Sequence, residues 1–183
     1  MRRAFGEKNG KKVPKTGENV DFAKCGGHLK EEKKMYEKFG NFDSAEEINA
    51  CAEGLLASGN EEKLIELARE NGIPEIFAKN YINGVSEEFV DWLNAAIGKL
   101  DVEAAIHKDK YVPAGPVADY LKSLCTERQF ALRVRCRTKS VEGCMEFIEE
   151  KTGKLVRKGI TCVPDMVCFR WGRDYFLKDG EDR

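Results

Sequence analysis

The densest group of residues that could do chemistry is a run of basic side chains in the C-terminal half of the chain. On a strand, alternate members of this run would share one face about 6.6 Å apart, near the spacing of successive phosphates. On a helix they would spread around the circumference. The run predicts a binding site for nucleic acid or for a partner protein, because cations held this close repel one another and an anionic partner lowers that cost. Pairing with the acidic middle of the same chain is the alternative. The members are Arg128, Arg133, Arg135, Arg137 and Lys139.

The tetrapeptide Cys25-Gly-Gly-His28 offers two metal ligands at short spacing. A structural zinc site needs four ligands, usually in two paired sets. The only other histidine is His107, and no second Cys/His pair follows. We therefore predict no metal ligand and no cofactor.

Catalytic motifs are missing from the sequence. It contains no Walker loop, no GxGxxG and no GxSxG. Adjacent carboxylates such as Glu46/Glu47 and Glu87/Glu88 lie in predicted first turns of helices, where the helix dipole already favours them. We predict no catalytic residue and no enzyme activity. A metal-dependent nuclease stays open as an alternative, since its acidic ligands can be far apart in sequence.

Aromatic residues near the C-terminus alternate with arginines. Aromatic rings beside arginines can stack on nucleobases, but more often they belong to a core with charged neighbours that reach the solvent. We favour the core. The residues are Phe169, Arg170, Trp171, Arg173, Tyr175 and Phe176.

Charge is segregated along the 183 residues although the net charge is only −1. Residues 1–40 carry a balance of +5, residues 41–103 one of −10, and residues 104–183 one of +4. Such fields steer association toward partners of opposite sign. The distribution favours a protein that binds a macromolecule.

The seven cysteines are scattered singly, and the basic, polar start resembles no signal peptide. No run approaches the roughly 20 apolar residues that span a bilayer. We therefore expect a soluble cytoplasmic protein with reduced thiols and no membrane partner.

These side chains must be positioned by short helices. Ser44 with Glu47 fits a capping box that opens a helix to about Ala57, Asn60 opens a second helix, and Pro74 opens a third. Ser86 is predicted to cap a fourth helix that carries an apolar stripe from Phe89 to Leu100. Connections this short favour antiparallel packing.

The C-terminal third is less clear. A helix begins near Pro116, and the alternation over 132–137 fits either a strand or the continuation of that helix. Ser140 caps a helix that we expect to end at Gly153. Residues 154–164 could hold a short strand, and 166–177 form either a last helix or a hairpin.

The sequence thus predicts a mainly α fold, a bundle of short antiparallel helices, with a small β-hairpin or short strands left open in the C-terminal third. Residues 1–40 are predicted to form a basic, partly flexible N-terminal arm. Residues 41–183 form one helical domain, acidic over 41–103 and basic over 104–183. The segment Leu64 to Tyr81 has the spacing of a helix-turn-helix, but its acidic flanks favour a structural helical hairpin.

Several segments in one order carry a family resemblance over roughly residues 42–177. The segments are Ala52-Glu-Gly-Leu-Leu56, Gly59-Asn-Glu-Glu-Lys-Leu-Ile-Glu-Leu-Ala68, Glu70-Asn-Gly-Ile-Pro74, Tyr81-Ile-Asn-Gly84, Ala95-Ala-Ile-Gly-Lys-Leu-Asp-Val-Glu103, the 130–144 region and Arg173-Asp-Tyr-Phe-Leu177. They resemble a family of small proteins from mobile elements and prophages of gut Clostridia.

That family includes an anti-CRISPR protein that inhibits the RNA-guided nuclease of type II systems. The resemblance implies a protein that binds the guide-loaded type II nuclease and blocks target DNA engagement or cleavage, with DNA as an open further component. It implies action in the cytoplasm of a bacterial host and leaves a homodimer open. It carries over no contact residue. The alternative is a nucleic-acid-binding accessory protein of a phage or mobile element.

Overall fold

The computed structural model describes residues 35–111, 113–160 and 162–178. The chain divides into two units, Met1–Glu32 and Lys33–Arg183, and every described residue belongs to the second. Most of the predicted N-terminal arm therefore lies outside the described residues, as do Cys25 and His28.

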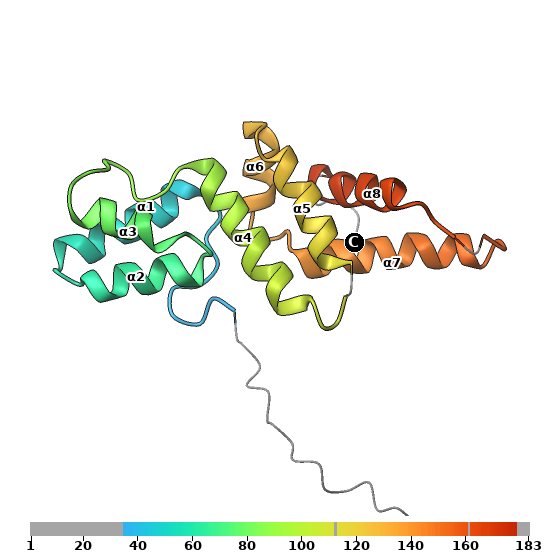
Figure 1. The fold of residues 1–183 in the computed structure, drawn as a ribbon, viewed down its shortest axis with the longest axis horizontal. Helices are drawn as coiled ribbons and strands as arrows, with labels where there is room; N and C mark the ends of the chain where they lie inside the picture. Colours follow the sequence, from blue (N-terminus) through green and yellow to red (C-terminus); the bar gives the residue numbers. More distant parts are fainter. Residues whose placement is uncertain (1–34, 112, 161, 179–183) are drawn as a thin grey trace, which may run out of the picture. The chain divides into compact units, whose positions relative to one another are not determined.

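The described residues form eight helices and no strand, which confirms the mainly α prediction (Figure 1). The helices are α1 (Ala45–Ala57), α2 (Glu61–Glu70), α3 (Glu75–Ile82), α4 (Trp92–His107), α5 (Ala114–Leu124), α6 (Arg128–Arg135), α7 (Val141–Val156) and α8 (Asp165–Leu177).

The first three helices begin where the local signals predict, although the Asn60 side chain makes no capping hydrogen bond at the start of α2. The Ser44 hydroxyl accepts a hydrogen bond from the Glu47 backbone N–H and caps α1. Gly72 follows α2 with a φ of +66°, a conformation that glycine adopts without strain. Pro74 stands directly before α3, where its missing N–H costs no helical bond.

The fourth helix begins later than predicted, and Ser86 does not cap it. Asp91 is the N-cap of α4, and its carboxylate accepts from the Asn94 backbone N–H at 2.8 Å. Phe89 and Val90 are buried outside any helix, because the amide of Asn49 satisfies both backbone polar groups of Val90. A tertiary contact thus replaces the first helical turn that Ser86 would have started.

The described residues of the C-terminal third form helices joined by turns and loops and no strand, so the strand alternatives are not realised there. The chain bends at 125–127 and continues as α6 rather than extending α5. Helix α7 runs through Gly153 to Val156, beyond the predicted end, because Gly153 adopts no positive φ that would stop the helix. Helix α8 replaces the alternative hairpin and returns along α7 (Figure 1).

Two hydrophobic cores meet at α4. Helices α1 to α3 enclose one core with Phe89, Val90 and Ala95. Helices α4 to α8 enclose the other, to which Ala96 contributes from the next position of α4. Because neighbouring residues of one helix serve different cores, α4 joins the two halves.

Among the described residues, no helix has the length and apolar character needed to cross a bilayer.

Candidate functional site

The predicted basic cluster lies on α6 and in the segment just after it. Helical geometry places some of its side chains in solvent and one in the interior. Arg128 and Arg133 are exposed, whereas Arg135 is 1% exposed. Arg135 follows the buried side of α6, which also carries Ala131 and Val134. The three alternating arginines therefore do not form one row on a common face.

Two members after α6 bind groups of the same chain. The Arg137 guanidinium lies 2.6 Å from an Asp43 carboxylate oxygen and 3.3 Å from one of Glu47. The Lys139 ammonium donates to the backbone carbonyls of Tyr175 and Lys178 at the end of α8. At Arg137, the structure brings the basic cluster to the acidic segment.

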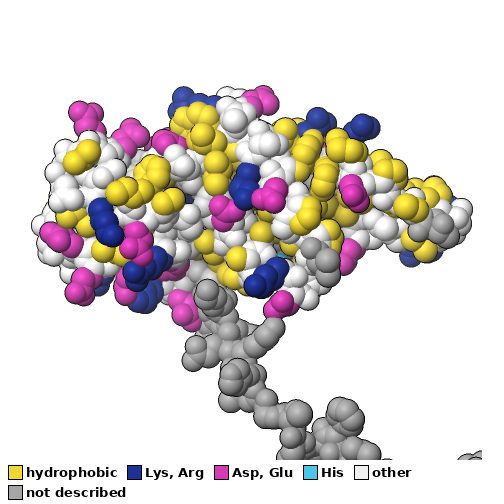
Figure 2. Space-filling model, viewed as in Figure 1, with side chains coloured by type: hydrophobic (Ala, Val, Ile, Leu, Met, Phe, Trp, Pro, Cys, Tyr) yellow, Lys and Arg dark blue, Asp and Glu magenta, His cyan; other side chains and the backbone are white. Residues whose placement is uncertain are grey.

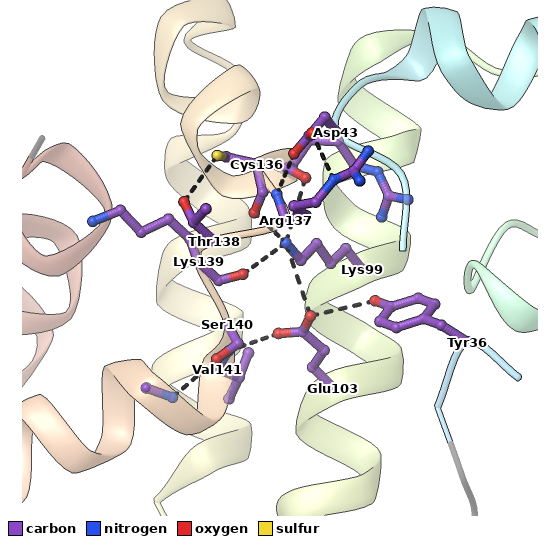
Figure 3. A network of polar contacts seen from close by, with 12 residues as sticks. Tyr36, Asp43, Lys99, Glu103, Cys136, Arg137, Thr138, Lys139, Ser140 and Val141 are labelled. Atoms are coloured by element: carbon purple, nitrogen blue, oxygen red, sulfur yellow. Dashed lines mark hydrogen bonds and ion pairs between the residues drawn. The ribbon is translucent and has the colours of Figure 1, made fainter. Parts of the chain in front are cut away.

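Lys99 of α4 is fully buried and binds the segment in which the chain reverses between α6 and α7 (Figure 3). Its ammonium donates to the carbonyls of Cys136 at 2.6 Å and Lys139 at 2.7 Å, and more weakly to that of Arg135 at 3.4 Å. Carbonyls at a helix C-terminus carry partial negative charge. Lys99 therefore serves as a cationic cap on the end of α6.

One turn along α4, Glu103 holds the start of the next helix. Its carboxylate accepts the backbone N–H of Val141, the first residue of α7, at 2.6 Å. The other oxygen accepts from the Tyr36 hydroxyl at 3.3 Å and lies 3.9 Å from the Lys99 ammonium. Figure 3 shows the side chains of Lys99 and Glu103 pointing from α4 toward the segment between α6 and α7. We call the buried group of Lys99, Glu103 and Arg135, with their hydrogen-bond partners, the junction. A negative charge at a helix N-terminus complements the dipole there.

Burial decides the protonation of this junction. Burial lowers the pKa of Lys99 to about 8, although the neighbouring Glu103 carboxylate opposes that change. Burial raises the pKa of Glu103 against the opposing effects of Lys99 and the Val141 N–H. The pKa of Tyr36 is raised, first by burial and then by the nearby Glu103 charge, so its hydroxyl keeps its proton as a donor.

Arg135 is the third buried charge. One terminal nitrogen donates to the Asn71 side-chain oxygen at 2.8 Å, and Asn71 in turn donates to the Leu67 carbonyl at the end of α2. The junction thus links α2, α4, α6 and α7 through polar contacts between the two cores.

A cavity of about 260 Å³ lies outside the junction, between α2, α4 and the segment that leads into α1. Tyr36 forms part of its wall. The backbone N–H groups of Lys38 and Phe39 donate to the Glu70 carboxylate and hold this segment on α2. The cavity is lined by Met35, Tyr36, Arg69, Glu70, Val102, Ala105 and Ile106.

Five exposed glutamates belong to α1, α2 and the loop before α4, and Figure 2 shows acidic side chains, with basic ones among them, on the α1–α3 end of the molecule. They form no ion pair with any described residue, in contrast to Glu66 and Glu75, which pair with Lys38 and Arg69. We call them the acidic edge: Glu53, Glu61, Glu62, Glu87 and Glu88.

The cysteines and other potential metal ligands form no disulfide and no metal-binding group within the described residues. The six cysteines described are free thiols, and burial raises the pKa of Cys125 and Cys144 to about 12. No group of three or more metal-ligating side chains occurs in the described part of the chain. Cys25 and His28, which the sequence did not favour as a metal site, lie outside the described residues.

The C-terminal aromatic residues belong to the core, as predicted. Phe176 is fully buried edge-on to Phe130, and Phe169 stacks on Tyr120 with the ring centroids 5.1 Å apart. Phe169 and Tyr120 both pack against the α4–α8 core.

Sequence reasoning missed Lys99, Glu103 and Asn71. A signal was present, because Lys99 and Glu103 interrupt the apolar stripe of Ala96, Leu100 and Ala104 at helical spacing. Charged residues on a buried stripe require partners, but the sequence does not show which backbone groups supply them.

Comparison of the chain with protein-family models, with curated proteins and with solved structures found no match.

Proposed function

We propose that this protein inhibits an RNA-guided nuclease of a type II CRISPR system by binding it and blocking target DNA engagement or cleavage. It acts by occupancy rather than by catalysis, in the cytoplasm of the bacterial host. The partner is the guide-loaded nuclease, which the family resemblance implies.

The acidic edge is the observation that carries this proposal. Type II nucleases hold the guide–target duplex in a positively charged channel. Exposed carboxylates that lack ion-pair partners repel one another in the free protein, and a basic surface relieves that repulsion. The edge lies on one half of the molecule, so a basic channel could contact it without competing with the α6–α7 junction.

The ion pairs of Arg137 with the acidic segment also favour the acidic edge as the surface that contacts the nuclease. Arg137 is paired with Asp43 and Glu47, so part of the acidic segment is already neutralised by the chain itself. Glu87 and Glu88 lie in the loop before α4 and are not neutralised in this way. The proposal therefore places the nuclease on the acidic edge and not on α1 beside Arg137.

A cleavage titration tests the proposal. Purified protein is added to guide-loaded nucleases from several type II subtypes before target DNA, and the cut fraction is measured. We expect one of them to be inhibited near molar equivalence. Co-purification with apo and guide-loaded nuclease, with and without target DNA, then identifies the blocked step. Persistent cutting by every nuclease at a large molar excess would contradict the proposal.

Charge-reversal variants locate the contact. We expect Glu87→Lys with Glu88→Lys to weaken inhibition at least tenfold, which corresponds to about 1.4 kcal/mol of binding free energy. The matched control is Glu146→Lys with Glu149→Lys, two exposed glutamates on α7, and this variant should inhibit as well as wild type. Equal loss in both variants would indicate a general charge effect instead of a contact at the acidic edge.

A further inference from the structure

Arg135 is a buried cation with few partners. Its side chain is 1% exposed, and among the described residues its one hydrogen bond of good geometry runs from a terminal nitrogen to Asn71. The Tyr36 hydroxyl also acts on the guanidinium and opposes the effect of burial on the pKa of Arg135. The Nε and Nη1 groups of Arg135 have no hydrogen-bond acceptor among the described residues. A buried donor without an acceptor costs about 1–3 kcal/mol, and more when the group is charged.

The other two buried charges of the junction are balanced by helix ends. Lys99 donates to carbonyls at the C-terminus of α6, and Glu103 accepts from the N-terminus of α7. Arg135 has the neutral amide oxygen of Asn71 instead. The junction therefore holds two buried cations and one buried anion, and Arg135 is the charge that lacks a counter-charge of its own.

Nearby carboxylates do not supply the missing acceptor. Glu103 is committed to Val141, Tyr36 and Lys99. Asp43 binds the backbone N–H and the guanidinium of Arg137. Both carboxylates act on Arg135 only through space, where they oppose the effect of burial on its pKa.

We propose that Arg135 is the centre of a binding site for a compact anion, either a carboxylate or an inorganic oxyanion, beneath Tyr36. Such an anion would accept from the guanidinium N–H groups that lack partners and would neutralise the excess positive charge. Charge-assisted hydrogen bonds to a guanidinium are about twice as strong as neutral ones.

Tyr36 is the gate to this site. It interacts with Glu103 on its inner side and lines the 260 Å³ cavity on the outer side. Its φ of +58° is unusual for a residue with a bulky side chain and stores about 1–3 kcal/mol of backbone strain. A movement of the backbone at Tyr36 that changes this φ would relieve the strain and, by shifting the ring, would open a path from the cavity toward Arg135, which does not itself line the cavity.

Thermal unfolding of the full-length protein tests the site. The protein is titrated with sodium phosphate and, separately, with sodium acetate at constant ionic strength. We expect a saturable rise in Tm of about 5 °C at a hundredfold excess over Kd. The tighter of the two titrations identifies the anion class, oxyanion or carboxylate.

Two variants separate the site from general screening. Arg135→Met removes the guanidinium from a buried position and should abolish the saturable rise. Arg128→Met removes an exposed arginine from the same helix and should leave the rise and its midpoint unchanged. A wild-type Tm that does not respond to either anion, or a response that persists in Arg135→Met, would overturn the proposal.

A direct measurement does not depend on the folding of a variant. Crystals of the wild-type protein soaked in bromide should show an anomalous peak within hydrogen-bond distance of the Arg135 guanidinium. A water at that position, with bromide found only at surface lysines and arginines, would refute the site.

Discussion

Lys99 and Glu103 act as a matched pair because they are separated by one turn of α4. Their spacing places the positive group at the C-terminal carbonyls of α6 and the negative group at the first N–H of α7. Removing one partner of a buried pair leaves an uncompensated charge and costs about 3–5 kcal/mol. These two side chains therefore determine the position of the reversal that carries Arg137 and Lys139.

The pH dependence of the free energy of unfolding should contain a contribution from the lowered pKa of Lys99. Its pKa is about 8 in the folded protein, below its ordinary value of 10.5, so between these values the unfolded chain binds more protons. The contribution of Lys99 to stability should therefore rise with pH through this window, by at most about 3 kcal/mol. The buried thiols of Cys125 and Cys144 act in the opposite direction, because they stay protonated in the folded protein while the unfolded chain loses those protons, so the Lys99 contribution is obtained as the difference between wild type and Lys99→Met. Urea unfolding at pH 7.5 and 9.5 checks this below the range in which Tyr36 titrates.

The variant Lys99→Met should lose that rise, although its stability at pH 7.5 is also lower. Lys79→Met replaces an exposed lysine on α3 and should keep the wild-type slope. Parallel pH curves for wild type and Lys99→Met would show that another group is responsible.

At the scale of elements, the turn after α2 packs directly on α4. Gly72 and Gly98 face each other so closely that a Cβ on either would overlap the backbone of the other. Gly72 also requires its positive φ to end α2. The contact brings Asn71 within reach of Arg135 and so connects the α1–α3 half to the junction.

Two glycine-to-alanine variants should have opposite effects. Gly98→Ala should reduce the free energy of unfolding by about 3 kcal/mol, because backbone atoms near Asn71 and Gly72 must move. Gly54→Ala lies on the exposed side of α1, where a Cβ meets no atom within 4 Å, and should add about 1 kcal/mol through helix propensity. Denaturant unfolding measures both, and a harmless Gly98→Ala would contradict the close approach.

At the scale of the whole second unit, α4 makes the two cores interdependent. Ala95 faces one core and Ala96 the other, and Trp92 packs against both. The polar junction joins the same helices a second time. We therefore expect residues 35–178 to unfold in one cooperative transition rather than as two separate halves.

Leu64→Ala tests this cooperativity from a distance. Leu64 is fully buried in the α1–α3 core, and its truncation should cost about 3 kcal/mol. Trp171 packs against the other core, so its fluorescence in a Trp92→Phe background reports the α4–α8 half. The Trp171 midpoint should fall together with the midpoint from circular dichroism. An unchanged Trp171 midpoint would mean that the halves unfold independently.

Local chemistry was enough to predict the helical character and several helix ends. Ser44 and Ser140 cap α1 and α7 through their own hydroxyls, and Gly72 ends α2 by its conformational freedom. These signals act within one turn of the chain, so they can be read without knowledge of the fold. The charge segregation and the candidate acidic surface are likewise properties of composition and order.

Only the tertiary structure decided the questions in which distant segments compete. Asn49 satisfies the backbone of Val90 and delays α4 to Asp91, and burial of one side of α6 selects helix over strand at 132–135. The same burial takes Arg135 out of the exposed basic cluster, and the approach of Asp43 pairs Arg137. A sequence shows which residues are charged, but their exposure and partners depend on contacts between segments as far apart as residues 43 and 137.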